Sequence, residues 1–108
     1  MEINTAVTAL DALAHETRLE VFRLLVRAGR GGLAAGIIAK EAGVLQNTLS
    51  NHLGKLSRAG LVSSRREGRS VIYSADFGAL SALVLYLVED CCMGDSRVCK
   101  PLAAAIHC

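Results

Sequence analysis

The 108-residue sequence offers little that would place it in a membrane or hold it together by disulfides. Its most apolar run covers only residues 77–88, well short of the roughly 20 that span a bilayer. The first residues lack the basic and apolar segments of a signal peptide. All four cysteines fall within the last eighteen residues, whereas a disulfide framework would spread them along the chain. These absences predict a cytoplasmic protein with no membrane partner and with reduced thiols.

Apolar side chains, by contrast, are abundant for so short a chain. Hydrophobic residues make up 52% of the sequence, and 108 residues are enough for one domain only. A small domain has too much surface to bury such an excess by itself, so we expect an oligomer. A net charge of +2 together with this hydrophobicity also excludes an intrinsically disordered chain.

The spacing of apolar residues predicts two helices in the first thirty residues. The first covers about 4–13, and His15 at its boundary is interpreted as a helix cap or a surface residue. The second carries Leu19 and Phe22 on one stripe and ends at Gly29.

Two further helices are predicted before residue 60. A short one covers 34–42 and ends at Gly43, and a longer one ends at Gly60. The apolar stripe of the longer helix consists of Leu45, Leu49, Leu53 and Leu56. Two short helices with a glycine-containing turn between them are typical of a helix-turn-helix.

The spacing then changes to that of a β-hairpin. Residues 62–66 and 69–74 flank a turn at Glu67 and Gly68, and the second segment is rich in β-branched and aromatic residues. With one more helix after the hairpin, the sequence predicts a mainly α fold in the order α-α-α-α-β-β-α. This is the order of a winged helix-turn-helix.

The last predicted helix begins at Asp76, whose side chain is a suitable cap, and runs to about Cys91 or Cys92. Its residues 80–88 are apolar on every side. Such a helix needs partners on every face, and one monomer cannot surround its own terminal helix. We therefore expect the seam of a homodimer here.

Four stretches of the chain carry a family resemblance. They are residues 13–22 leading into the second helix, 46–53 of the fourth helix, 58–62 at its exit and 66–69 of the hairpin, together with Leu56 and Tyr73. Together they resemble the ArsR/SmtB family of metal-responsive winged-helix repressors. The resemblance covers about residues 10–92, and it implies a homodimeric repressor that binds double-stranded operator DNA and is released by an effector.

The resemblance also bears on the effector site. Many arsenic-responsive members carry Cys-Val-Cys at the start of the helix-turn-helix, but residues 32–38 hold no such ligand. Zinc-responsive members place Asp and His pairs along the last helix, where this chain has no histidine. What remains is Cys91 and Cys92, followed by Cys99. This is similar to the branch whose arsenite site is a vicinal cysteine pair with a third cysteine.

Basic residues gather where the predicted fold would face DNA. Residues 43–73 contain five basic residues and one acidic residue, a net charge of +4, while the rest of the chain carries −2. Short amide and hydroxyl groups near the start of the fourth helix suit base edges in the major groove. The candidates for base contacts are Gln46, Asn47, Thr48, Ser50 and Asn51. The candidates for phosphate contacts are Lys55, Arg65, Arg66 and Arg69, with His52 for a phosphate or a base.

The cysteine cluster suits a soft, thiophilic metal centre. At a helix end, Cys91 and Cys92 can turn both sulfurs to one side, and Gly94 lets the chain reverse so that Cys99 returns as a third ligand. Three thiolates in a pyramid match As(III) or Sb(III), whereas zinc prefers four ligands. Cys108 lies on an alanine-rich tail, where a small hydrophobic role without ligation is the simpler interpretation.

Other functions stay open from the sequence. Cys91 and Cys92 alone would bind methylarsenite, which offers two exchangeable positions, or the thiols could sense oxidation or a soft divalent ion. A thiol enzyme such as an arsenate reductase is disfavoured because the chain has no Cys-X-X-Cys, phosphate-binding loop or βαβ pattern. The charge distribution disfavours an inert adaptor. We thus expect no enzyme and no organic cofactor, with a DNA-binding and dimerisation domain over 1–94 and a tail, 95–108, that contributes to the effector site.

Overall fold

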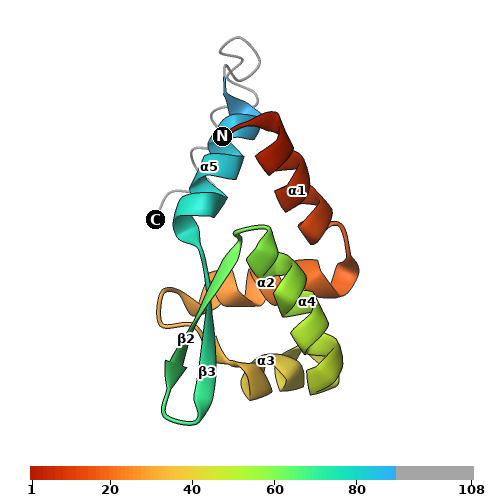
Figure 1. Ribbon diagram of the computed structural model, residues 1–108, viewed down its shortest axis with the longest axis vertical. Coiled ribbons are helices and arrows are strands. Elements are labelled where there is room, and N and C mark those ends of the chain that lie inside the picture. The colour runs from red at the N-terminus through yellow and green to blue at the C-terminus, as the bar shows by residue number, and fades with distance from the viewer. Residues whose placement is uncertain (90–108) are drawn as a thin grey trace.

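A computed structural model of the chain describes residues 1–89 as five helices and a three-stranded antiparallel sheet (Figure 1). In chain order the elements are α1 (Ile3–Leu13), α2 (Glu16–Ala28), β1 (Leu33–Ala34), α3 (Ala35–Ala42), α4 (Gln46–Arg58), β2 (Val62–Glu67), β3 (Ser70–Ala75) and α5 (Phe77–Val88). This order confirms the predicted winged helix-turn-helix and adds one short strand. In Figure 1, α3, the start of α4 and the hairpin turn lie at the lower end, while the start of α1 and the end of α5 lie at the upper end.

The sheet consists of the wing hairpin and the additional strand β1. β3 lies in the middle, paired with β2 along its whole length and with both residues of β1. Because Glu67 pairs with Ser70, the turn consists of Gly68 and Arg69, and the predicted turn at Glu67 and Gly68 is wrong by one residue. A two-residue strand is too short to show a hydrophobic alternation, so the sequence pattern does not predict β1.

Two helices begin with side-chain caps at the expected residues. His15 Nδ1 accepts a hydrogen bond of 3.1 Å from the Thr17 N–H at the start of α2. The Asp76 carboxylate accepts one of 2.9 Å from the Ala79 N–H at the start of α5. α2 ends at Gly29, whose φ of 77° suits glycine. These observations confirm both cap predictions and the predicted end of α2.

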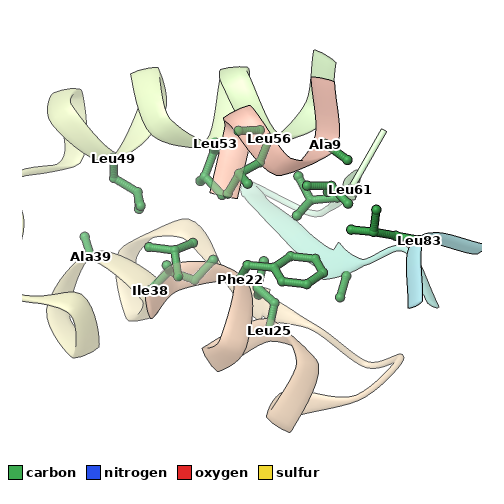
Figure 2. Close-up of a cluster of buried hydrophobic side chains, with 14 of the residues drawn as sticks. Ala9, Phe22, Leu25, Ile38, Ala39, Leu49, Leu53, Leu56, Leu61 and Leu83 are labelled. Atoms are coloured by element: carbon green, nitrogen blue, oxygen red, sulfur yellow. The ribbon is translucent and has the colours of Figure 1, made fainter. Parts of the chain in front are cut away.

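The hydrophobic core lies between α2, α3 and α4 (Figure 2). Leu49, Leu53 and Leu56 point from α4 into it and are almost completely buried. Their neighbours in the cluster include Phe22, Leu25, Ile38 and Leu61. Leu45 does not join them, contrary to the predicted stripe, and is 74% exposed. It precedes the helix with an extended backbone (φ −71°, ψ 149°), which takes its side chain off the helical stripe.

α1 carries two kinds of apolar side chain on different sides. Ala6, Ala9 and Ala12 are buried within the monomer. Ile3 and Val7 are 64% and 58% exposed. The small side chains therefore pack this helix onto its own chain, and the large ones are left at the surface.

α5 ends at Val88, and Glu89 has an extended backbone (φ −56°, ψ 130°). Glu89 also places negative charge at the negative end of the helix dipole, where it is unfavourable. The predicted end at Cys91 or Cys92 lies outside the described residues. All four cysteines and the predicted tail lie outside the described residues. None of the helices between residues 1 and 89 is long and apolar enough to cross a membrane.

Candidate nucleic-acid interface

The first turns of α4 present a polar surface. The five residues predicted to contact bases are all exposed: Gln46, Asn47, Thr48, Ser50 and Asn51. Leu49, which lies between Thr48 and Ser50, is only 1% exposed and holds this part of the helix against the core. One face of α4 is therefore anchored, and the opposite face carries uncharged hydrogen-bonding groups in the size range that base edges require.

The side chains at the start of α4 have defined local contacts. The Asn47 Oδ1 accepts a hydrogen bond of 2.9 Å from the Thr48 N–H in the first turn of α4. The Gln46 side chain lies over α3, because its Nε2 is 3.5 Å from the position that a Cβ on Gly36 would take. These contacts limit the directions in which the two amides can donate and accept hydrogen bonds.

His52 lies on α4, where this helix contacts α2, and is half-buried. The Arg18 Nη1 is 3.4 Å from His52 Nδ1, and the Arg18 Nε donates to the Ala12 carbonyl at the end of α1 at 2.6 Å. The His15 ring is centred 4.7 Å from the His52 ring. Burial, His15 and Arg18 lower the pKa of His52 below its usual 6.5. A neutral His52 can accept from Arg18 through Nδ1, which links α4 to α2, and Arg18 extends the link to the end of α1.

Lys55, predicted as a phosphate contact, lies next to α1. Its Nζ is 3.3 Å from the Asp11 Oδ2, and the two side chains are 42% and 68% exposed. An exposed ion pair of this kind is worth about 0–1 kcal/mol. The ammonium group is therefore easily redirected to a phosphate.

Alternation along β2 separates the two wing arginines. Arg65 and Glu67 share one face of the strand, where Arg65 Nε donates to Glu67 Oε2 at 2.8 Å. Arg65 Nη2 donates to the Gly31 carbonyl at 2.8 Å, and Nη1 to Ser74 Oγ at 3.3 Å. Arg65 thus fastens the wing to the loop before β1. The i, i+2 spacing of Arg65 and Glu67 predicts only that the two side chains share one face of the strand.

Arg66 and Arg69 are exposed, Arg66 on the other face of β2 and Arg69 in the turn. Within residues 1–89 neither forms a hydrogen bond or an ion pair with another side chain. Their guanidinium groups remain available to an anion. The wing and the start of α4 lie at the same end of the molecule (Figure 1).

The cysteine site predicted from the sequence falls outside this geometry. Cys91, Cys92 and Cys99 lie beyond residue 89, the last described residue. Among the described residues, no group of three or more His, Cys, Asp or Glu side chains is placed to hold a metal ion. The described part of the chain therefore contributes the polar and basic surface of α4 and the wing.

An anchored helix with an exposed polar face, preceded by a short helix and followed by a basic wing, defines a winged helix-turn-helix DNA-binding protein. A family described as a helix-turn-helix domain matches residues 13–65. The chain is 34% identical over 86 residues to the transcriptional activator HlyU of Vibrio cholerae, covering 78% of this chain and 77% of HlyU. It is 30% identical over 105 residues to the "Probable mercury resistance operon repressor" of Streptomyces lividans, covering 97% and 75% of the two chains.

Two solved structures similar to this chain are also of DNA-binding or regulatory proteins. An ArsR-like transcriptional regulator from Rhodococcus sp. RHA1 superposes with a TM-score of 0.72 at 26% identity, covering 96% of this chain and 94% of that one. The homodimeric winged helix-turn-helix DNA-binding domain of Mb0332 from Mycobacterium bovis gives 0.67 at 27% identity, covering 98% and 89%. The chain belongs to the ArsR family of winged helix-turn-helix transcriptional regulators.

The length of the match differs between relatives. With the regulator Rv0081 of Mycobacterium tuberculosis the identity is 39% over 62 residues, which covers 57% of this chain and 53% of Rv0081. The chain thus matches about half the length of that relative.

Proposed function

We propose that the protein is a homodimeric transcriptional repressor that binds operator DNA through α4 and the wing, and that a trivalent arsenical bound by thiols releases it. The observation that carries the DNA-binding part is the exposed polar face of α4, opposite the buried Leu49, Leu53 and Leu56. Amides and hydroxyls there suit base edges, while Arg66 and Arg69 suit phosphates.

Exposed apolar side chains of α1 and α5 support the homodimer. On α1 they are Ile3, Val7 and Leu10, and on α5 Leu85 and Leu87. A groove lined by Met1, Ala82, Leu85, Tyr86, Val88 and Glu89 lies at the same end of the molecule. The Mb0332 domain, which shares this fold, is homodimeric. A two-fold dimer would present two copies of α4 to half-sites about one helical turn apart.

The effector assignment rests on the cysteines. Cys91 and Cys92 follow Val88, the last residue of α5, by three and four positions, and Cys99 follows them. Three thiolates satisfy the valence of As(III) or Sb(III) and need no further ligand. Because the thiols adjoin the end of α5, binding there acts on the proposed dimer seam, and a change at the seam alters the separation of the two α4 helices.

A second effector class has a specific observation in its favour. The relative from Streptomyces lividans is named for mercury resistance, and it aligns with 97% of this chain. Hg(II) is a soft ion that two thiolates can hold. The two-thiol alternative therefore includes Hg(II) and methylarsenite, both of which need only Cys91 and Cys92.

The test is a titration of the DNA complex with arsenite, antimonite, methylarsenite, Hg(II), Cd(II) and Zn(II). We expect arsenite to release the wild type and to have no effect on Cys91→Ser, Cys92→Ser or Cys99→Ser, with Cys108→Ser as the matched control that behaves as wild type. Release of Cys99→Ser by methylarsenite or Hg(II) but not by arsenite fits the three-thiol site. Release of Cys99→Ser at wild-type arsenite concentrations contradicts it and favours the cysteine pair alone.

A further inference from the structure

Leu45 is the most exposed large apolar side chain among the described residues, at 74%. It is the residue immediately before α4 and packs into no part of the core. The other strongly exposed apolar side chains include those of α1 and α5, at the opposite end of the molecule (Figure 1). The dimer seam proposed above therefore does not account for Leu45.

The position of Leu45 also runs against helix-capping preferences. It is the N-cap residue of α4, where Ser, Thr, Asn and Asp are strongly preferred and Leu is among the least favourable residues. The Leu45 side chain offers no cap hydrogen bond, and among the described hydrogen bonds the first turn of α4 receives one only from Asn47 Oδ1, to the Thr48 N–H. A residue that gives no cap at an N-cap position and also exposes an apolar side chain violates two local rules at once, which is typical of a functional position.

The neighbours of Leu45 identify the chemistry that would cover it. Gln46 and Asn47 follow directly and are exposed. Amide side chains pair with adenine N6 and N7 in the major groove, and the partner base of adenine carries the 5-methyl group of thymine, the main apolar group in that groove. In the helix-turn-helix docking mode, the start of the second helix contacts base edges.

We infer that Leu45 is a specificity-determining residue that contacts a thymine 5-methyl group in each half-site. The inference rests on the proposed operator binding through α4. It predicts a preference for A·T over G·C at one position per half-site, with Leu45 against the thymine methyl and an amide of Gln46 or Asn47 on the adjacent base edge.

The experiment first selects the tightest-binding duplex from a randomised pool with the full-length protein. Each thymine of that duplex is then replaced singly by uracil, which deletes only the methyl group. For the wild type we expect one uracil per half-site to weaken binding about four-fold, the effect of losing one buried methyl group. In Leu45→Ser this penalty disappears, while the serine caps α4 and keeps the helix folded.

Two variants complete the test. Leu45→Met keeps an apolar side chain and is expected to keep a penalty at the same thymine. Ile37→Ser is the matched control, because Ile37 is also apolar and 49% exposed but lies on α3, the first helix of the motif. It is expected to leave the uracil penalty unchanged.

The outcomes separate the two proposals. A uracil penalty that persists in Leu45→Ser, or that disappears in Ile37→Ser instead, overturns the assignment to Leu45 while DNA binding stands. A selected duplex in which no uracil weakens binding also overturns it. A pool from which no sequence is enriched over random DNA overturns sequence-specific operator binding, and the Leu45 assignment with it.

Discussion

At the scale of single residues, the structure divides the basic side chains by what they already contact. Arg65 makes three internal hydrogen bonds, whereas Arg66, its neighbour on the other face of β2, makes none among residues 1–89. The sequence presents both as equivalent phosphate ligands. Only the pairing of β2 with β3, and the closeness of the Gly31 carbonyl, distinguish them.

Replacing the two arginines by alanine should therefore have different effects, one on DNA binding and one on stability. Arg66→Ala is expected to keep the fold and to lower the slope of log affinity against log salt by about 0.9 for each phosphate that Arg66 neutralises. Arg65→Ala is expected to lower the free energy of unfolding by about 1 kcal/mol because the wing loses its attachment. Salt titrations of DNA binding and urea denaturation measure the two effects. Equal salt slopes for wild type and Arg66→Ala would show that Arg66 binds no phosphate.

His52 gives a pH-dependent prediction. Its pKa is lowered in the folded protein by burial, His15 and Arg18, so the unfolded chain takes up a proton at a higher pH than the native one. The stability contributed by neutral His52 is complete above pH 6.5 and is lost as the pH falls through the lower, native pKa. NMR titration should place the His52 pKa below 6.5. Arg18→Gln should raise it, and Arg23→Gln, a control on the outer side of α2, should not.

At the scale of elements, the sequence predicts helices better than their ends and predicts short strands poorly. Leu49 and Leu53 recur at helical spacing because a buried face requires it, and the structure buries both. Leu45 continues the same spacing but is exposed, since periodicity does not show where the backbone leaves the helix. β1 is a further example, because its pairing with β3 depends on tertiary proximity.

The candidate site was predictable to a similar degree. The exposed amides of α4 follow from the position of the core stripe on the same helix. The internal role of Arg65 does not, because two of its three partners, Gly31 and Ser74, are distant in sequence and meet it only after the sheet has formed. The effector cysteines lie beyond residue 89 and stay a prediction from the sequence.

Gly32 lies between Gly31, in the loop before β1, and the first residue of that strand. Its φ is +70°, and an added Cβ would collide with the Tyr73 carbonyl and lie 2.6 Å from Ser74 Oγ. Gly32→Ala is therefore expected to cost about 2–4 kcal/mol, from backbone strain and overpacking together. Gly43→Ala is the matched control, with a φ of +69° and open space around it, and should cost about 1–2 kcal/mol from backbone strain alone. Thermal denaturation of both variants decides whether close packing, rather than strain alone, requires Gly32.

At the scale of the whole molecule, α5 contributes to both the monomer core and the surface. Leu83 is 3% exposed and belongs to the core, whereas Leu85 and Leu87 are 62% and 56% exposed. Leu83→Ala should destabilise each monomer by about 2–5 kcal/mol. Leu85→Glu together with Leu87→Glu should instead give folded monomers that bind operator DNA weakly. Sedimentation and circular dichroism distinguish the cases, and a double variant that stays dimeric would show that these residues lie outside the seam.

The most general prediction concerns the link between the two ends of the molecule. If an arsenical lowers DNA affinity by some factor, thermodynamic linkage requires DNA to lower arsenical affinity by the same factor. Arsenite binding should therefore be weaker for the operator complex than for the free protein, by the ratio measured in the release experiment. Random DNA at a concentration too low to bind serves as the control. A release that occurs without this reciprocal loss would mean that arsenite removes protein irreversibly, outside the binding equilibrium, and the regulatory proposal would then fail.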